Sequence, residues 1–160
     1  MTDPAIIPAP MPDWTPDERR RIETIAASYA ALTRRSLTAS APDTATALWF
    51  APEVIVAHGT QPDPIFFFGN RAALELFEMS FEQFTRLPSR LSAEPLAQAE
   101  RARLLERVAR FGIIHDYAGV RISATGRRFR IDGASVWNLT GADGNPAGQA
   151  ASFSGWQILD

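Results

Sequence analysis

The chain has 160 residues, 46% hydrophobic and 21% charged, which suits one globular domain with an extension. Its net charge of −2 gives no general attraction to nucleic acid or to an anionic membrane, and no apolar run approaches the ~20 residues of a membrane span. Because cysteine is absent, disulfides, thiolate nucleophiles and cysteine-linked flavins or chromophores are excluded. We therefore expect a cytoplasmic protein whose partners are neither nucleic acid nor membrane.

The N-terminal part of the chain predicts an arm followed by a helix. Residues 1–14 are rich in proline and alanine, and we expect them to form a flexible arm. Thr15 and Glu18 form a capping box around Pro16, so an amphipathic helix begins here, and we expect it to run to Leu37. Its apolar stripe must pack on the sheet of the same chain or on a partner's helix. The predicted division is 1–14 (arm), 15–50 (helical extension) and 51–160 (domain).

The strongest local motif is Pro64–Phe77. Its aromatic run ends at Phe68 with strong β propensity, Gly69 permits a sharp turn, and Asn70 can cap the following helix. Short helices are predicted over residues 43–50, 80–84 and 97–111, and strands over 53–57, 65–68, 113–124, 127–139 and 147–158. Segregated helices and strands indicate an α+β fold. We predict a five-stranded antiparallel sheet with helices over one face, plus the N-terminal amphipathic helix.

The closing strands predict which side chains face the core. A two-residue turn at Thr125-Gly126 would pair Ile122 with Phe129. Strict alternation then places an apolar set, with one carboxylate, on one face. This set is Ile114, Asp116, Ala118, Val120, Ile122, Phe129, Ile131, Ser135, Trp137 and Leu139. The opposite face carries Arg121 directly across from Arg130.

The order of elements resembles the PAS fold, and the motif at Pro64–Phe77 resembles the opening of a PAS domain. The sequence is most similar to the MEKHLA-domain family, a PAS-related group, and the similarity covers about Trp49 to Trp156. The motifs that carry it are Ala57-His58-Gly59-Thr60, Asp63-Pro64, Leu87–Arg90, Asp116-Tyr117, Gly119–Ile122, Gly126–Phe129 with Ile131, Val136–Asn138, and Gly148–Ala151 with Phe153.

This resemblance implies a sensory role. PAS domains hold ligands between the inner face of the sheet and the helices, or they hold none and mediate protein contacts. Bacterial MEKHLA proteins resemble this chain as stand-alone domains. Plant members end homeodomain–leucine-zipper transcription factors, whose DNA-binding segment has no counterpart in this sequence. The implied partners are a small organic ligand, a partner protein, or a second copy of the chain in a homodimer.

Several residues could contact such a ligand. Asp116 would be a buried carboxylate with a raised pKa, unless backbone groups or Ser135 hydrogen-bond to it. Trp137 could stack on a planar ligand or only fill the core. In flavin-binding PAS relatives a strand glutamine faces the cofactor, which singles out Gln149. The complete predicted set is His58, Phe68, Asn70, Asp116, Trp137 and Gln149.

All sixteen basic residues are arginine, whose planar guanidinium suits bidentate recognition. Arg121 and Arg130, if opposite each other, repel unless an acid lies nearby. We predict that they hold an anion, contact a partner, or pair with a carboxylate of the N-terminal helix such as Glu23.

Other classes of function leave weaker signals. His58 and His115 are far apart and lack clustered carboxylates, so no metal site is indicated, haem is not expected, and no cofactor is identified. No Gly-rich phosphate loop or catalytic triad motif is visible. One alternative is a small acid/base enzyme with the cone fold of ketosteroid isomerase, with Asp116, His58 or Tyr117 in a deep pocket. Another is a dimerisation module with a filled core.

Overall fold

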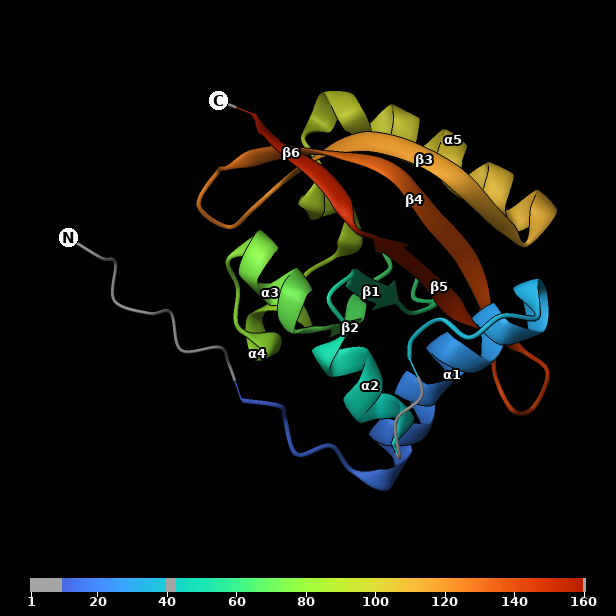
Figure 1. The fold of residues 1–160 in the computed structure, drawn as a ribbon. Helices are drawn as coiled ribbons and strands as arrows, with labels where there is room; N and C mark the ends of the chain where they lie inside the picture. The colour runs from blue at the N-terminus through green and yellow to red at the C-terminus, as the bar shows by residue number, and fades with distance from the viewer. Residues whose placement is uncertain (1–9, 40–42, 160) are drawn as a thin grey trace.

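Six antiparallel strands form the sheet of the computed structural model, which describes residues 10–39 and 43–159. They are β1 (Val54–His58), β2 (Phe66–Gly69), β3 (Ile113–Ile122), β4 (Arg128–Thr140), β5 (Pro146–Phe153) and β6 (Gly155–Leu159). Their order is β2-β1-β5-β4-β3, with β6 paired to β4 (Figure 1). The predicted α+β class is confirmed, but the predicted fifth strand is divided into two.

Helices cover both faces of this sheet. They are α1 (Pro16–Thr33), α2 (Thr44–Phe50), α3 (Arg71–Phe77), α4 (Phe81–Phe84) and α5 (Pro95–Phe111), with a 3-10 helix η1 (Ser89–Ser92) before α5. The indole nitrogen of Trp137 donates to the Ile25 carbonyl of α1 (3.1 Å), and the Asn138 side chain donates to the Val108 carbonyl of α5 (3.0 Å). Because neighbouring residues of a strand point to opposite faces, α1 covers one face and α5 the other. We call the α5 side the inner face and the α1 side the outer face.

The turn between β3 and β4 is longer than predicted, and this changes the register. The Ser123 amide donates to the Arg127 carbonyl (2.9 Å), so three residues rather than two lie inside the turn. Arg121 therefore pairs with Phe129, and Val120 pairs with Arg130. The predicted pairing of Arg121 with Arg130 is wrong, because a slip of one residue moves a side chain to the other face.

A second irregularity crosses the middle of the sheet. Gly133 in β4 has a φ of 63°, and the register with β3 is disturbed around Tyr117. Gly133 lies opposite Ser154, the residue that separates β5 from β6. Alternation changes phase there, so Ile131 and Val136 share the inner face while Trp137 points outward. The predicted single face that joined Ile131 to Trp137 is therefore wrong.

The N-terminal region packs on the domain. Helix α1 begins at the predicted capping box but ends at Thr33 rather than Leu37, because Arg34 adopts a left-handed conformation with a φ of 58°. Residues 1–9 of the predicted arm lie outside the described residues. Trp14, also assigned to the arm, is 6% exposed and packs edge-on against Trp49 of α2. Ile25 of α1 belongs to the same hydrophobic core. The division of the chain into an extension (15–50) and a domain (51–160) stays a prediction.

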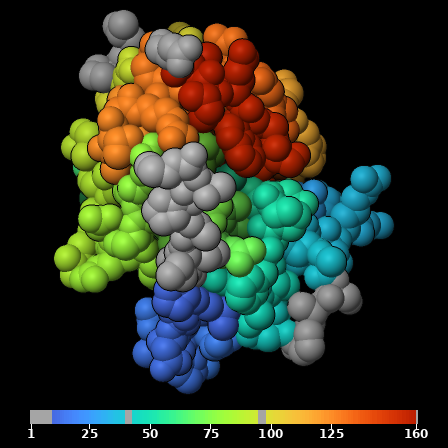
Figure 2. Space-filling view, turned by 60° about the vertical axis from the view of Figure 1, so that its left-hand side comes forward, coloured from blue at the N-terminus to red at the C-terminus, as the bar shows by residue number. Residues whose placement is uncertain are grey.

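Strand β6 lies at the surface beside the β3–β4 turn (Figure 2). Trp156 and Ile158 on this strand are 39% and 43% exposed. Within the described part of the chain, no helix combines the length and the hydrophobicity that crossing a bilayer requires.

Candidate functional site

A cavity of about 70 Å³ lies between the inner face of the sheet and α5. Its side chains come from β1, β2, α3, η1, α5, β3, β4 and β5. Its apolar walls include Val56, Phe66, Phe77, Leu104, Ile131, Val136 and Phe153. A single buried water needs roughly 10–15 Å³ of such volume, so the cavity is larger than a one-water site.

Arg121 projects into the cavity from β3. It is 8% exposed, and burial lowers the pKa of its guanidinium below the ordinary arginine value. It donates to the Val120 carbonyl (3.1 Å), and its Cζ lies 5.2 Å from the centre of the Tyr117 ring. Arginine stays protonated in proteins, so Arg121 is a buried positive charge.

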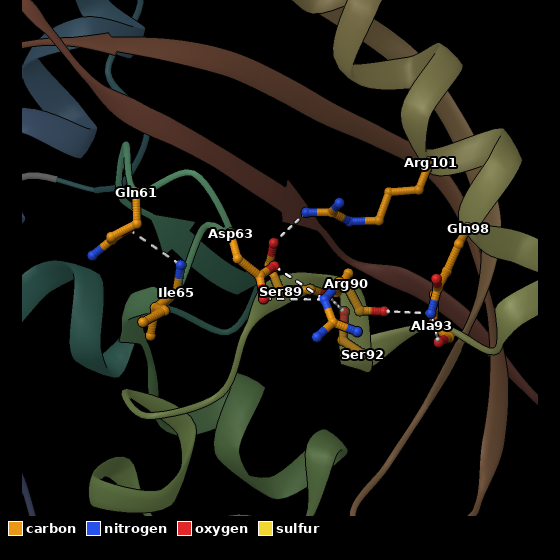
Figure 3. A network of polar contacts seen from close by, with 9 residues as sticks. All are labelled: Gln61, Asp63, Ile65, Ser89, Arg90, Ser92, Ala93, Gln98 and Arg101. Carbon is orange, nitrogen blue, oxygen red and sulfur yellow. Dashed lines mark hydrogen bonds and ion pairs between the residues drawn. The ribbon is translucent and has the colours of Figure 1, made fainter.

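Arg101 reaches the same cavity from α5. Figure 3 shows its guanidinium extending from α5 to the hydroxyl of Ser89 on η1, to which it donates. Burial, and then the positive charge of Arg121, lower the pKa of Arg101. The positive charge of Arg121 therefore acts on Arg101, and both side chains line the same cavity.

The carboxylates near these arginines are engaged elsewhere or exposed. Asp63, which attracts Arg101, pairs with Arg90 at 3.1 Å (Figure 3). Glu100, which attracts Arg121, is exposed. The ion pairs found among the described residues use other arginines, so neither Arg101 nor Arg121 has a carboxylate in contact there.

Neutral polar groups complete the lining. His58 Nδ1 lies 3.0 Å from the Gly59 carbonyl, and since a carbonyl only accepts, Nδ1 carries the proton and Nε2 is left as an acceptor. Burial, opposed by that hydrogen bond, lowers the pKa of His58, which favours the neutral ring. Gln149 lies directly across from His58 in the ladder and donates to Asn138 (3.1 Å), which in turn donates to the Val108 carbonyl. This chain of hydrogen bonds connects the cavity wall to α5.

The sequence that forms this site matches a known protein family. The family model of the MEKHLA domain matches residues 19–158. The chain belongs to the MEKHLA-domain family. No curated protein sequence matches this MEKHLA domain.

Solved structures with the same fold include PAS domains and a blue-light photoreceptor. A PAS domain of a protein from Colwellia psychrerythraea has a TM-score of 0.59 at 16% identity, covering 72% of this chain and 92% of that one. A PAS domain from a two-component sensor histidine kinase has a TM-score of 0.51 at 16% identity, covering 69% and 88%. The light-state dimer of the fungal blue-light photoreceptor Vivid has a TM-score of 0.56 at 10% identity, covering 82% and 91%. The predicted PAS-like fold is confirmed.

The MEKHLA domain brings three of the predicted site residues to the cavity: His58, Gln149 and Arg121. Trp137 lies on the outer face under α1, where its ring centroid is 5.0 Å from that of Tyr29. Phe68 packs against Trp14 and Phe81, also away from the cavity. These two aromatic side chains are core residues in this structure.

The side chain of Asn70 forms hydrogen bonds with backbone groups and does not line the cavity. It is fully buried, its Oδ1 accepts from the Ile55 and Ala73 amides (3.1 and 3.0 Å), and its Nδ2 donates to the Glu53 carbonyl (2.7 Å). Asn70 thus caps α3, as predicted, and ties β1 and the segment before it to the helix start.

Asp116 and Arg130 are exposed and lie outside the cavity lining. Asp116 pairs with Arg107 of α5 at 3.1 Å, so the expected buried carboxylate is not found there. Of the residues named for the enzyme alternative, His58 and Tyr117 line the cavity and Asp116 does not. Arg121 faces α5, on the side of the sheet opposite α1, which excludes the predicted pairing with Glu23.

Sequence reasoning missed Arg101, Ser89 and Ser92, and placed Arg121 on the face away from the core. A signal for Arg101 was present, because it occurs three and seven residues before Leu104 and Val108, which are buried residues of α5. Positions with this spacing share one face of a helix. A charged residue within an apolar stripe is a candidate for a buried site.

Proposed function

We propose that this MEKHLA domain is a sensory module that binds a small molecule in the cavity between the inner face and α5. The observation that supports it is a cavity with apolar walls and a few convergent polar groups, His58, Gln149, Arg101 and Arg121, which is the usual character of a small-molecule site. The PAS domain of a sensor histidine kinase among the structural neighbours agrees with this role. A dimerisation module with a filled core would not need such a cavity.

Binding would change how α5 packs on the sheet. Arg101 connects α5 to η1, and the hydrogen bonds from Gln149 through Asn138 to Val108 connect β5 and β4 to α5. A ligand that competes for Gln149 or Arg101 would alter these links, and a differential interaction of this kind is what shifts a conformational equilibrium.

We also propose that the response is read out by a homodimer or a partner protein. The light-state dimer of Vivid, which has the same fold, supports a dimeric readout. Helix α1 packs on its own sheet through Ile22 and Ile25, so a dimer contact of α1 would use its exposed face. Light scattering on the full chain at several concentrations measures the mass, and a monomer at all concentrations, with and without ligand, would leave only the partner-protein readout.

The binding proposal is tested with ligands of any charge. Native mass spectrometry of protein purified from its own host, together with thermal unfolding against a library of small neutral, cationic and anionic compounds, would detect an occupant. We expect a bound mass or a rise in Tm, because a ligand that binds only the folded state stabilises it. Ala151→Leu would fill the cavity and abolish the rise, whereas Ala142→Leu in the exposed β4–β5 turn would not. Failure of every compound and an absent bound mass would overturn the proposal.

A further inference from the structure

We propose that the cavity binds a short-chain monocarboxylate whose carboxylate group is held between Arg121 and Arg101. This inference rests on the proposed function, because it specifies the class of ligand for the same cavity. It follows from the charge, the shape and the size of the cavity.

Charge is the first argument. Arg121 on β3 and Arg101 on α5 line one cavity, and neither has a carboxylate in contact among the described residues. A buried charge without a carboxylate in contact is costly, and two like charges that line one cavity add repulsion. An anion between the two guanidinium groups would remove both penalties. The cavity therefore selects a negatively charged ligand.

The walls decide what kind of anion fits. A guanidinium group matches a carboxylate or a phosphate through two parallel hydrogen bonds. The remaining lining is largely apolar, with Phe66, Leu104 and Ile131 among its side chains. A phosphate would turn some of its oxygens toward these walls, where they would lose hydrogen bonds to water. A carboxylate with a hydrocarbon end satisfies the arginines and the apolar walls at once.

Size limits the length of the hydrocarbon end. The cavity of about 70 Å³ is several times the space that one buried water needs. It is therefore suited to a short monocarboxylate such as propionate or butyrate. Because Arg121 belongs to the sheet and Arg101 to α5, the bound carboxylate would join the two elements that the cavity separates.

Calorimetric titration of the full chain with butyrate tests this inference, and butyramide and inorganic phosphate serve as matched probes. Butyramide has the same shape as butyrate without its charge, and phosphate is an anion without a hydrocarbon end. We expect butyrate to bind and both other probes to bind at least about tenfold more weakly, since a hydrogen bond to a charged group contributes about 1.5–3 kcal/mol.

Variants distinguish a specific role of the two arginines from the general effect of removing one positive charge. Arg121→Gln and Arg101→Gln should each weaken butyrate binding about ten- to hundredfold. Arg130→Gln on the outer face and Arg103→Gln on the exposed side of α5 are controls with the same charge change, and they should leave it unchanged. Circular dichroism and thermal unfolding would show that each variant is folded.

Each outcome has one meaning. Equal binding of butyrate and butyramide, or an unaltered affinity in Arg121→Gln, would overturn the carboxylate inference and leave the proposed sensory site standing. Phosphate binding as tight as butyrate would overturn the organic ligand. Failure of all three probes, when a neutral library compound binds, would also overturn the inference. Failure of every library compound, together with an absent bound mass, would overturn the proposed function as well.

Discussion

The two faces of the sheet differ in their packing and in how their buried polar groups are satisfied. On the outer face, Trp137 is fully buried under α1, and its indole nitrogen is satisfied by the Ile25 carbonyl. On the inner face, α5 leaves a cavity and brings Arg101 toward Arg121 without a carboxylate between them. The outer face maximises packing, whereas the inner face keeps a charge arrangement that opposes folding. A departure from good packing of this kind is expected at a functional site.

Removing the large side chain of Trp137 should disrupt the packing of the outer face. Trp137→Ala should lower the free energy of unfolding by about 3–5 kcal/mol, because it leaves a cavity and removes the ring contact with Tyr29. Urea unfolding followed by circular dichroism measures the change. Trp156→Ala on β6, where the ring is 39% exposed, is the matched control and should cost much less. A similar cost at both positions would contradict the assignment of Trp137 to a closed core.

The inner face should respond in the opposite direction. Arg121→Met should raise the free energy of unfolding of the ligand-free protein by about 1–3 kcal/mol, because replacing a buried charge by an apolar side chain of similar volume is often stabilising. The same variant should lose butyrate binding. Arg130→Met, at an exposed position, should stay within about 0.5 kcal/mol of the natural protein. A strongly destabilised Arg121→Met would mean that Arg121 holds the fold together.

The bulge in β4 sets which residues belong to which face. Gly133→Ala should lower the free energy of unfolding by about 1 kcal/mol, because the φ of 63° is strained for alanine. A Cβ at Gly133 would meet open space, so the effect comes from the backbone alone. Asn at this position should recover part of the loss, since it tolerates the left-handed region better. Chemical unfolding of the three proteins compares them, and an equal loss for Ala and Asn would contradict this explanation.

The smallest expected effect is the pH response of His58. Its pKa is lowered in the folded protein, so the unfolded chain takes up a proton first as the pH falls below the ordinary histidine value of about 6.5. Stability should therefore fall with decreasing pH from about 6.5 until the lowered pKa is passed, by at most about 1.4 kcal/mol per pH unit. His58→Asn should flatten this slope. Parallel slopes in the natural protein and His58→Asn would refute the assignment.

The sequence was sufficient for local features that depend on neighbouring residues. The capping boxes at Thr15 and Ser80, and the cap at Asn70, follow from short-range hydrogen bonds and are all present. The order of helices and strands, with the motifs of the MEKHLA family, was sufficient for the PAS-like fold.

The sequence was insufficient where tertiary contacts set the register. The β3–β4 turn is lengthened because Ser123 and Thr125 donate to Glu78 at the end of α3 (3.1 and 2.9 Å), a contact 45 residues away in the chain. This turn and the bulge at Gly133 together decide that Arg121 points inward and Trp137 outward. Strict alternation could not place the candidate site, because it lacks both irregularities.

The two turns at the ends of β4 have unequal freedom to vary in length. The first is fixed on Glu78, and an added residue would break these hydrogen bonds or shift the register of β4 against β3. The second, between β4 and β5, is mostly exposed, and Asp143 and Asn145 hold it through bonds inside the turn itself. Insertions and deletions among MEKHLA domains are therefore expected to collect after Thr140, while the spacing from Arg121 to Trp137 stays constant. An alignment in which that spacing changes freely would mean that the two faces are assigned differently in each member.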